Sequence, residues 1–314
     1  MVIKNNSNYP FIKIPSSLVK HDSLEVAWQR ICRVHAMHTQ PKNKKGVLIY
    51  GESGEGKSFL AEQYEALFPP RKVREKTFRP VFRYRFKQSN KQIDDILKLL
   101  IKALGTTPPK GKTEPGELDE QFRHLVKELG VELIILDEIQ QVLPNTDGVT
   151  ALNTLKYFCS LLDELPASIV FIGSERAMRL LTFGKTDKTV DDNEQLSRRM
   201  MRSVKLEKIE PRTDDWLECI NWFIDKIGFP FLNYKDGPLL NRLYLAYMER
   251  SFSTLESLFL LEDMSDIKDK SVLLSKLKEN YSMYGKAKLN PFCSDDLPDS
   301  EVNTLVNRIF QTGH

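Results

Sequence analysis

Short apolar runs, separated by segments of helical periodicity, fill the first two thirds of the chain. Residues 46–50, 131–136 and 168–172 are nearly continuous apolar runs, which is typical of strands buried on both faces. Residues 80–86 alternate aromatic with basic positions, and residues 204–209 form a further short run. Amphipathic helices are predicted between these strands, at residues 22–38, 58–67, 92–104, 117–129 and 149–165. Strands that alternate with helices predict an α/β fold with a central parallel sheet.

The pattern changes after Pro211, where helical segments follow one another without buried-strand runs. These segments are residues 214–227, 239–250, 254–263, 272–281 and, after a stretch rich in proline and aspartate, 301–310. We therefore expect an N-terminal extension (1–20), an α/β domain (21–210), a smaller all-helical lid domain (211–284) and a C-terminal tail (285–314).

Composition and charge narrow the protein class only slightly. The net charge of +3 is too small to indicate nucleic-acid binding by itself. The sequence contains no run of eighteen apolar residues, and its first residues resemble no leader peptide, so we expect a cytoplasmic protein without membrane contact. The four cysteines are scattered without metal-ligand spacing, which predicts reduced packing residues.

Residues 51–58 read Gly-Glu-Ser-Gly-Glu-Gly-Lys-Ser and fit the phosphate-binding pattern GxxxxGK[ST]. In this pattern backbone amides surround the phosphates, the lysine reaches the terminal phosphates and the hydroxyl binds Mg2+. The loop also opens a helix, whose N-terminal partial charge attracts anions. The sequence therefore predicts an ATP and Mg2+ site, with Lys57 and Ser58 in these two roles; a glycine-rich turn without a ligand is the alternative. The predicted nucleotide-binding residues are Gly51, Glu52, Ser53, Gly54, Glu55, Gly56, Lys57, Ser58 and Phe59.

Two acids end the apolar run at residues 131–136. Asp137 is predicted to hold Mg2+ together with Ser58, as the corresponding aspartate does in P-loop ATPases. Glu138 is predicted to orient and deprotonate the attacking water, a role that hydrolysis needs and that transfer to a bound small substrate does not. An acidic helix cap after a buried strand is the other interpretation of this pair.

Three polar residues complete the candidate catalytic set. Ser174 follows the predicted strand at 168–172, where it contacts the γ-phosphate or positions water, unless it is a loop serine or a helix N-cap. Arg199, with Arg198 as second choice, is predicted to reach the ATP of a neighbouring subunit and to stabilise charge in the transition state. For each arginine, an ion pair with an acid or a DNA contact is the alternative.

The order of these motifs is similar to that in AAA+ ATPases, and within them the chain resembles the TniB/TnsC family of transposition regulators. The resemblance rests on residues 51–58, 137–140, 172–175 and 195–199 and covers residues 15 to 260 approximately. It implies an AAA+ P-loop fold and a homo-oligomer, a ring or filament, that forms with ATP on double-stranded DNA. It also implies a link between target-selector proteins, CRISPR-guided in some systems, and a transposase.

Two departures from the family pattern affect the candidate site. Family members often carry a glycine-arginine pair at the start of a late lid helix, where the arginine senses the γ-phosphate; here the comparable stretch begins Arg250-Ser251-Phe252. The usual Arg-Phe pair near the finger is replaced by Arg199-Met200, which leaves the choice between Arg198 and Arg199 open.

Contacts with DNA require basic residues that meet phosphates. Two clusters are candidates, although charged runs are often only solvated surface. They comprise Arg71, Lys72, Arg74, Lys76, Arg79, Arg83 and Arg85 in the first, and Lys110 and Lys112 in the second.

Three other functions share some of these motifs. A helicase loader or replication initiator shares all of them, but initiators often add a winged-helix domain, for which the sequence beyond residue 265 is short. A P-loop kinase for a small molecule needs an acceptor base and lid arginines near the P-loop, and Glu138 with the paired arginines argues against it. A scaffold that uses nucleotide as a structural switch, without turnover, is the third.

Overall fold

The chain folds into two units. The computed structural model describes residues 12–40, 45–87, 92–109, 114, 116–143, 149–182, 196–264 and 266–312, and for 149–151 and 312 the backbone alone. The first unit comprises the described residues of Met1–Pro15, Glu25–Glu52 and Lys57–Leu206. The second comprises those of Ser16–Leu24, Ser53–Gly56 and Glu207–His314.

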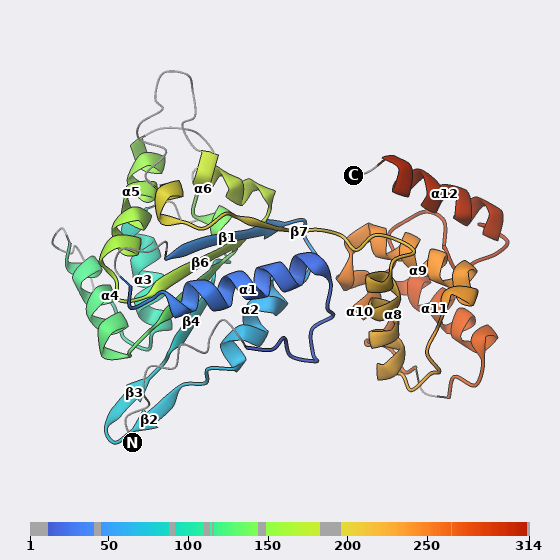
Figure 1. The fold of residues 1–314 in the computed structure, drawn as a ribbon, viewed down its shortest axis with the longest axis horizontal. Coiled ribbons are helices and arrows are strands. Elements are labelled where there is room, and N and C mark those ends of the chain that lie inside the picture. Colours follow the sequence, from blue (N-terminus) through green and yellow to red (C-terminus); the bar gives the residue numbers. More distant parts are fainter. Residues whose placement is uncertain are drawn as a thin grey trace. The chain divides into compact units, whose positions relative to one another are not determined.

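A five-stranded parallel sheet forms the centre of the first unit (Figure 1). Its spatial order is β4-β5-β6-β1-β7, so each strand pairs with neighbours that are distant in sequence. The strands are β1 (Gly46–Gly51), β4 (Val81–Arg85), β5 (Leu133–Asp137), β6 (Ser168–Gly173) and β7 (Val204–Leu206). All five coincide with predicted strands, and the predicted α/β fold class is confirmed.

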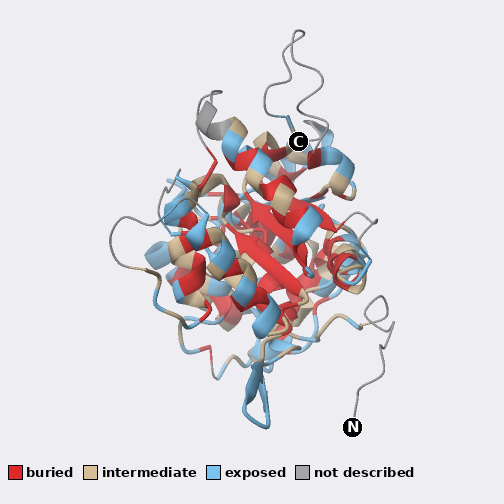
Figure 2. Ribbon diagram, turned by 90° about the vertical axis from the view of Figure 1, so that its left-hand side faces the viewer, coloured by how far each residue is buried: buried red, intermediate tan, exposed pale blue. Residues whose placement is uncertain are grey.

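The sheet is buried on both faces (Figure 2). Leu48 of β1 and Phe171 of β6 lie opposite one another. They belong to a hydrophobic cluster that includes buried side chains from the helices at residues 93–103, 117–128 and 149–164. Val47 and Val170, which alternate with them, are equally buried. This burial explains why β1, β5 and β6 appear in the sequence as apolar runs rather than as alternating patterns. The described helices of this unit are α1 (Asp22–Ala36), α2 (Lys57–Ala66), α3 (Ile93–Ala103), α4 (Glu117–Glu128), α5 (Val149–Glu164) and α6 (Arg179–Thr182), with 3-10 turns η2 (Ile139–Gln141) and η3 (Glu175–Met178).

The first unit also contains a two-stranded hairpin that the sequence pattern does not predict. It consists of β2 (Arg71–Val73) and β3 (Lys76–Phe78), which pair antiparallel with each other and with no strand of the central sheet. Figure 2 shows it as an exposed, pale blue projection.

The second unit is helical around its own core. Trp216, Tyr247 and Phe259 are among its fully buried side chains. Arg242 is 2% exposed and donates hydrogen bonds to the carbonyl oxygens of Pro291 and Leu297, which fixes the segment before the last helix. The elements are α8 (Asp214–Lys226), η4 (Tyr234–Asp236), α9 (Gly237–Arg250), α10 (Phe252–Phe259), α11 (Lys270–Tyr284) and α12 (Asp299–Thr312).

The cysteines of both units are thiols without disulfide bonds. All four are buried, and burial raises the pKa of the Cys32 thiol to about 11. Within the described ranges, no helix combines the length and the apolar character that crossing a bilayer requires.

His35 joins three elements inside the first unit. Its ring is 0% exposed, and its Nδ1 and Nε2 atoms lie 3.0 Å from the Tyr64 hydroxyl of α2 and 3.2 Å from a Glu132 carboxylate oxygen beside β5. Burial lowers the pKa of His35 from its ordinary value of 6.5, and the Glu132 hydrogen bond opposes this only partly. The folded unit therefore favours the neutral form of His35.

This pKa difference predicts a loss of stability in acid. The unfolded chain binds a proton at His35 more readily than the folded chain does. The contribution of His35 to the free energy of unfolding should therefore be complete above pH 6.5 and be lost as the pH falls through the lower pKa of the folded state. His35→Gln should flatten that dependence by up to about 1.4 kcal/mol per pH unit. Urea unfolding at pH 7.5, 6 and 5 measures it. The control is His124→Gln, at a side chain that is 76% exposed; equal slopes in wild type and His35→Gln would contradict the assignment.

Candidate nucleotide-binding site

Three strand ends meet at one edge of the central sheet. Tyr50, the penultimate residue of β1, lies opposite Gly173, the last residue of β6, and Leu136 of β5 lies opposite Phe171 of β6. Because the three strands are parallel, the segments that follow them begin at the same edge. That edge is where an open α/β sheet binds ligands.

The P-loop connects β1 to α2, as predicted. Gly54 and Gly56 have φ values of +95° and +75°, a left-handed conformation that favours glycine. Gly51 is required for another reason, since a Cβ there would lie 2.5 Å from the Leu206 carbonyl oxygen. Successive left-handed and turn conformations make backbone N–H groups converge on an anion.

Lys57 is the first residue of α2 and is 8% exposed. Its ammonium group donates a hydrogen bond to the Glu52 carbonyl within the same loop. Ser58 is half-buried in the first turn of the helix, and Phe59, Glu52 and Ser53 are exposed. The lysine is thus already directed back over the loop that precedes it.

Glu55 has a different environment from the other loop positions. It groups with the helical unit, where its carboxylate is 1% exposed. The Ser251 hydroxyl donates to one carboxylate oxygen, and the Tyr247 hydroxyl lies 3.4 Å from the other. Its side chain therefore has a structural role, and only its backbone can serve a phosphate. Ser251, at the departure from the family's glycine-arginine pair, is part of this arrangement.

Asp137 ends β5 with a carboxylate that is 1% exposed. Its Oδ1 accepts a hydrogen bond of 2.9 Å from the Glu138 amide, whereas Oδ2 is buried and has no hydrogen-bond partner among the described residues. Arg83 and Arg85 of β4 each place a nitrogen 3.9 Å from Oδ2. An acceptor oxygen in this state suits a water molecule bound to Mg2+, so the residues fit the predicted metal.

Glu138 adopts the left-handed conformation with φ of 59° and ψ of 39°. One carboxylate oxygen lies 3.5 Å from Nη2 of Arg85, and the other accepts a hydrogen bond from the Gln140 side-chain amide. With 28% of its side chain exposed, Glu138 is accessible to water at the sheet edge.

Ser174 follows β6 and is half-buried. It occupies the N-cap position of η3, but its side chain makes no capping hydrogen bond. Its amide donates a hydrogen bond of 3.1 Å to Oε1 of Gln140. A single amide side chain therefore connects Glu138 with Ser174.

The two arginines lie in the helical turn at residues 196–199. Arg199 donates from Nε and Nη2 to the two carboxylate oxygens of Asp163 in α5, at 2.6 Å each. This bidentate pair raises the pKa of Arg199. Arg198 is exposed. Glu194 and Gln195 of the same motif lie outside the described residues.

The basic run at residues 71–85 separates into two groups. Arg83 is held by Glu65 at 3.1 Å and Glu62 at 3.2 Å, and Arg79 donates to the Ala103 carbonyl at 3.0 Å. Together with Arg85 these side chains belong to internal networks, whereas Arg71, Lys72, Arg74 and Lys76 form no ion pair within the described part of the chain. Lys110 and Lys112 lie outside the described residues.

Sequence reasoning missed the roles of Gln140 and Arg85 beside Glu138. Gln140 stood within a recognised motif without a function, and Arg85 was grouped with the DNA candidates. Arg85 of β4 and Ser174 after β6 are distant in sequence from the segment that carries Glu138 and Gln140, so spacing along the chain gives no signal of these contacts.

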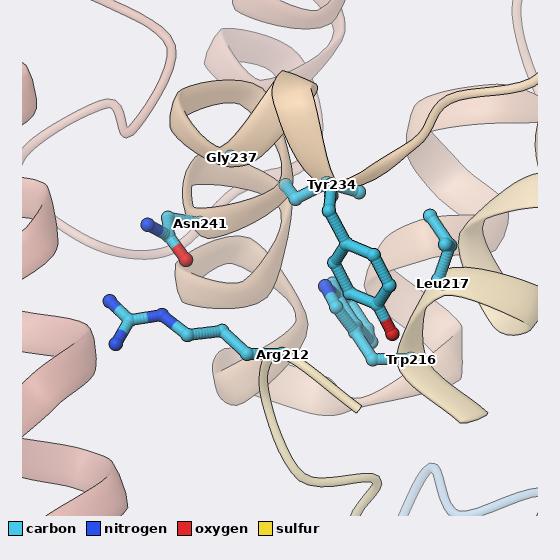
Figure 3. Close-up of a pocket in the computed structure, with 7 residues that line it drawn as sticks. Arg212, Trp216, Leu217, Tyr234, Gly237 and Asn241 are labelled. Atoms are coloured by element: carbon cyan, nitrogen blue, oxygen red, sulfur yellow. The ribbon is translucent and has the colours of Figure 1, made fainter. Parts of the chain in front are cut away.

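A pocket of about 200 Å³ lies in the helical unit (Figure 3) and contains none of the predicted site residues. The aromatic rings of Trp216 and Tyr234 lie beside it, with Arg212 and Asn241 nearby. Nη1 of Arg212 donates a hydrogen bond of 2.7 Å to Oδ1 of Asn307, and the Tyr234 hydroxyl donates one of 2.5 Å to Oδ1 of Asp214. These polar groups around the pocket therefore already have partners.

Comparison with known proteins gives a family match and several distant structures. The family model described as "Bacterial TniB protein" matches residues 13–208. No curated protein sequence matches significantly. Similar solved structures include Cdc6p from Pyrobaculum aerophilum, at 12% identity and a TM-score of 0.48, covering 98% of this chain and 90% of that one. The Walker-type ATPase of Pyrococcus abyssi shows 13% identity and a TM-score of 0.46 over 96% and 92% of the two chains. The ORC2 protein of Aeropyrum pernix in its ADP form shows 12% identity and a TM-score of 0.47 over 97% and 72%.

Proposed function

The chain belongs to the TniB family, and from this premise we propose that it is an ATP-dependent AAA+ regulator of DNA transposition. In this proposal it oligomerises on duplex DNA with ATP and Mg2+ and hydrolyses ATP at subunit interfaces. It links target-selector proteins to a transposase.

The observation that supports hydrolysis most directly is the arrangement around Glu138. A carboxylate that is accessible to water stands one residue after a buried metal-binding candidate, and Gln140 connects it with Ser174. A nucleotide-switched scaffold would need the P-loop but no such carboxylate.

The phosphate-binding roles fall to the P-loop and Asp137. The loop amides and Lys57 would hold the phosphates, and Ser58 with Asp137 would hold Mg2+, the latter through water. Bound Mg2+ neutralises phosphate charge as it develops. Lys57 can exchange its Glu52 carbonyl for a phosphate without leaving the loop.

Glu138 would accept the proton of the attacking water, and Ser174 would contact the γ-phosphate. The hydroxyl of Ser174 makes no capping bond, which suits that role. Either Arg199 or Arg198 would act across a subunit interface; we assign this role to Arg198 first because its side chain is exposed, whereas Arg199 is half-buried and paired with Asp163. Arg199 would then fix the turn that presents Arg198.

A helicase loader or replication initiator would use the same site. Membership of the TniB family favours transposition over this alternative. Electron microscopy with ATP and duplex DNA tests assembly, and binding to a transposase from the same element tests the pathway.

Glu138→Gln should abolish turnover while leaving nucleotide binding intact, because the amide keeps the size of the side chain but accepts no proton. We expect kcat to fall by about 100- to 10,000-fold, with oligomers on DNA persisting in ATP. Phosphate release and nucleotide titration measure the two properties. The control is Glu175→Gln, an exposed acid just after β6. Normal turnover in Glu138→Gln would overturn the role of Glu138, and absence of turnover in wild type, with and without DNA, would favour the scaffold.

Mixing variants tests the arginine in trans. Arg198→Ala should bind ATP but hydrolyse it slowly, since its neighbour lacks the cation that stabilises the transition state. Mixed with Glu138→Gln subunits it should regain activity, because some interfaces then combine an intact Glu138 with an intact Arg198. Arg202→Ala, at an exposed position nearby, serves as the control. If the mixture is no more active than its components, Arg198 does not act across the interface.

A further inference from the structure

The β2–β3 hairpin carries a concentration of exposed positive charge. Residues 71–77 are all exposed, and Val73 is 50% exposed. Arg71, Lys72, Arg74 and Lys76 are basic, and Glu75 is the acid among residues 71–76. None of these four basic residues forms an ion pair with any residue that the structure describes. The hairpin thus presents charge without internal neutralisation.

Packing does not explain the hairpin. Each strand has three residues and pairs only with the other, and isolated two-stranded hairpins are marginal in water. The turn residue Arg74 has a φ of 56°, which is unfavourable for a side chain larger than glycine's. The hairpin is therefore an exposed, charged projection whose residues belong to neither hydrophobic core.

The charges point in more than one direction. Cross-strand partners share a face of a hairpin, and Arg71 pairs with Phe78, Val73 with Lys76, and Lys72 with Thr77. Arg71 and Lys76 therefore project from one face and Lys72 from the opposite face. With Arg74 at the turn, positive charge surrounds the hairpin rather than covering one side.

We propose that this hairpin contacts the phosphates of duplex DNA by entering a groove. A two-stranded ribbon fits the major groove, which is about 12 Å wide and has phosphates on both sides. A flat acidic protein surface would meet only one face of the hairpin, whereas a groove meets both. The inference rests on the proposed function, because it names the element by which that function's DNA is held.

The structure also excludes the neighbouring arginines from this contact. Arg79 and Arg83 are bound by α2 and by a backbone carbonyl, and Arg85 lies beside Glu138. Among the basic residues between 71 and 85, those of the hairpin combine exposure with the lack of an ion pair to any described residue.

Salt dependence of DNA binding tests the proposal. The variant changes Arg71, Lys72, Arg74 and Lys76 to Gln in the full chain with ATP and a mixed-sequence duplex. If all four meet phosphates, the slope of log K against log salt should become less negative by about 3 to 4, and affinity at low salt should fall. Glu75→Gln should change affinity in the opposite direction, since it removes the hairpin's acid.

The control removes the same charge from other exposed helical positions of the first unit. It changes Arg33, Lys102, Lys127 and Lys156 to Gln. An equal loss of slope in the control would overturn the proposal, since net charge would then be responsible. So would an unchanged slope in the hairpin variant, or loss of transposase binding with DNA binding intact. Failure of the wild type to bind duplex DNA would instead contradict the proposed function.

A second inference comes from a different observation, the position of the Gln140 amide. Its Nε2 donates to the Glu138 carboxylate, and its Oε1 accepts from the Ser174 amide at 3.1 Å. Space for this side chain depends on Gly173, where a Cβ would lie 2.3 Å from Oε1. Both ends of the amide are therefore fixed, one by β6 and one by Glu138.

We infer that Gln140 is a positioning residue that sets the orientation of Glu138 by reference to the end of β6. This also rests on the proposed function, because Glu138 is the base only there. The amide can donate to a carboxylate but cannot take its proton, so it orients Glu138 without competing for the proton.

Gln140→Glu separates this role from a structural one. The substitution keeps the size that Gly173 accommodates but sets a carboxylate that cannot donate against Glu138, so the hydrogen bond that orients Glu138 is lost. We expect kcat to fall by about 10- to 100-fold while KM for ATP stays unchanged, because the P-loop is not altered. Gln141→Glu adds the same charge one residue later and should leave kcat and KM unchanged. Wild-type kcat in Gln140→Glu, with Glu138→Gln inactive, would overturn this inference while leaving the proposed function intact.

Discussion

The parallel register of β1, β6 and β5 determines where every candidate residue lies. Pairing of Tyr50 with Gly173, and of Leu136 with Phe171, ends the three strands at one edge. A shift by one residue in either pairing would reverse the faces of a strand that is buried on both sides. The hydrophobic core therefore fixes the register, and the register fixes the positions at which the P-loop, Asp137 and Ser174 begin.

Electrostatics at this edge depend on β4, whose end contributes no predicted catalytic residue. Asp137 is buried and needs positive neighbours, because an isolated buried carboxylate is strongly unfavourable. Arg83 and Arg85 supply them at 3.9 Å from Oδ2, too far for hydrogen bonds. The charge is balanced while the oxygen keeps its capacity to accept from a metal-bound water.

The sequence was most informative where one physical cause dominates. Burial on both faces produces apolar runs, and these identified β1, β5 and β6, whereas alternation of aromatic with basic residues identified β4. The glycines of the P-loop follow from its left-handed backbone. The β2–β3 hairpin was not predicted because its three-residue strands bury no face, so the sequence shows no hydrophobic periodicity there. The ion pairs of Arg83 with Glu65 and of Arg199 with Asp163 were not predicted, because the acids lie on other elements at separations of 18 and 36 residues.

Glu138 occupies a backbone conformation that disfavours its own side chain. The left-handed region costs a residue with a Cβ roughly 1–2 kcal/mol relative to the right-handed one, whereas glycine adopts it readily. The residue that suits the turn after β5 is therefore not the residue that suits the proposed chemistry. A laboratory selection for thermal stability alone would favour glycine at position 138, and the resulting protein would be sturdier and without its proposed base.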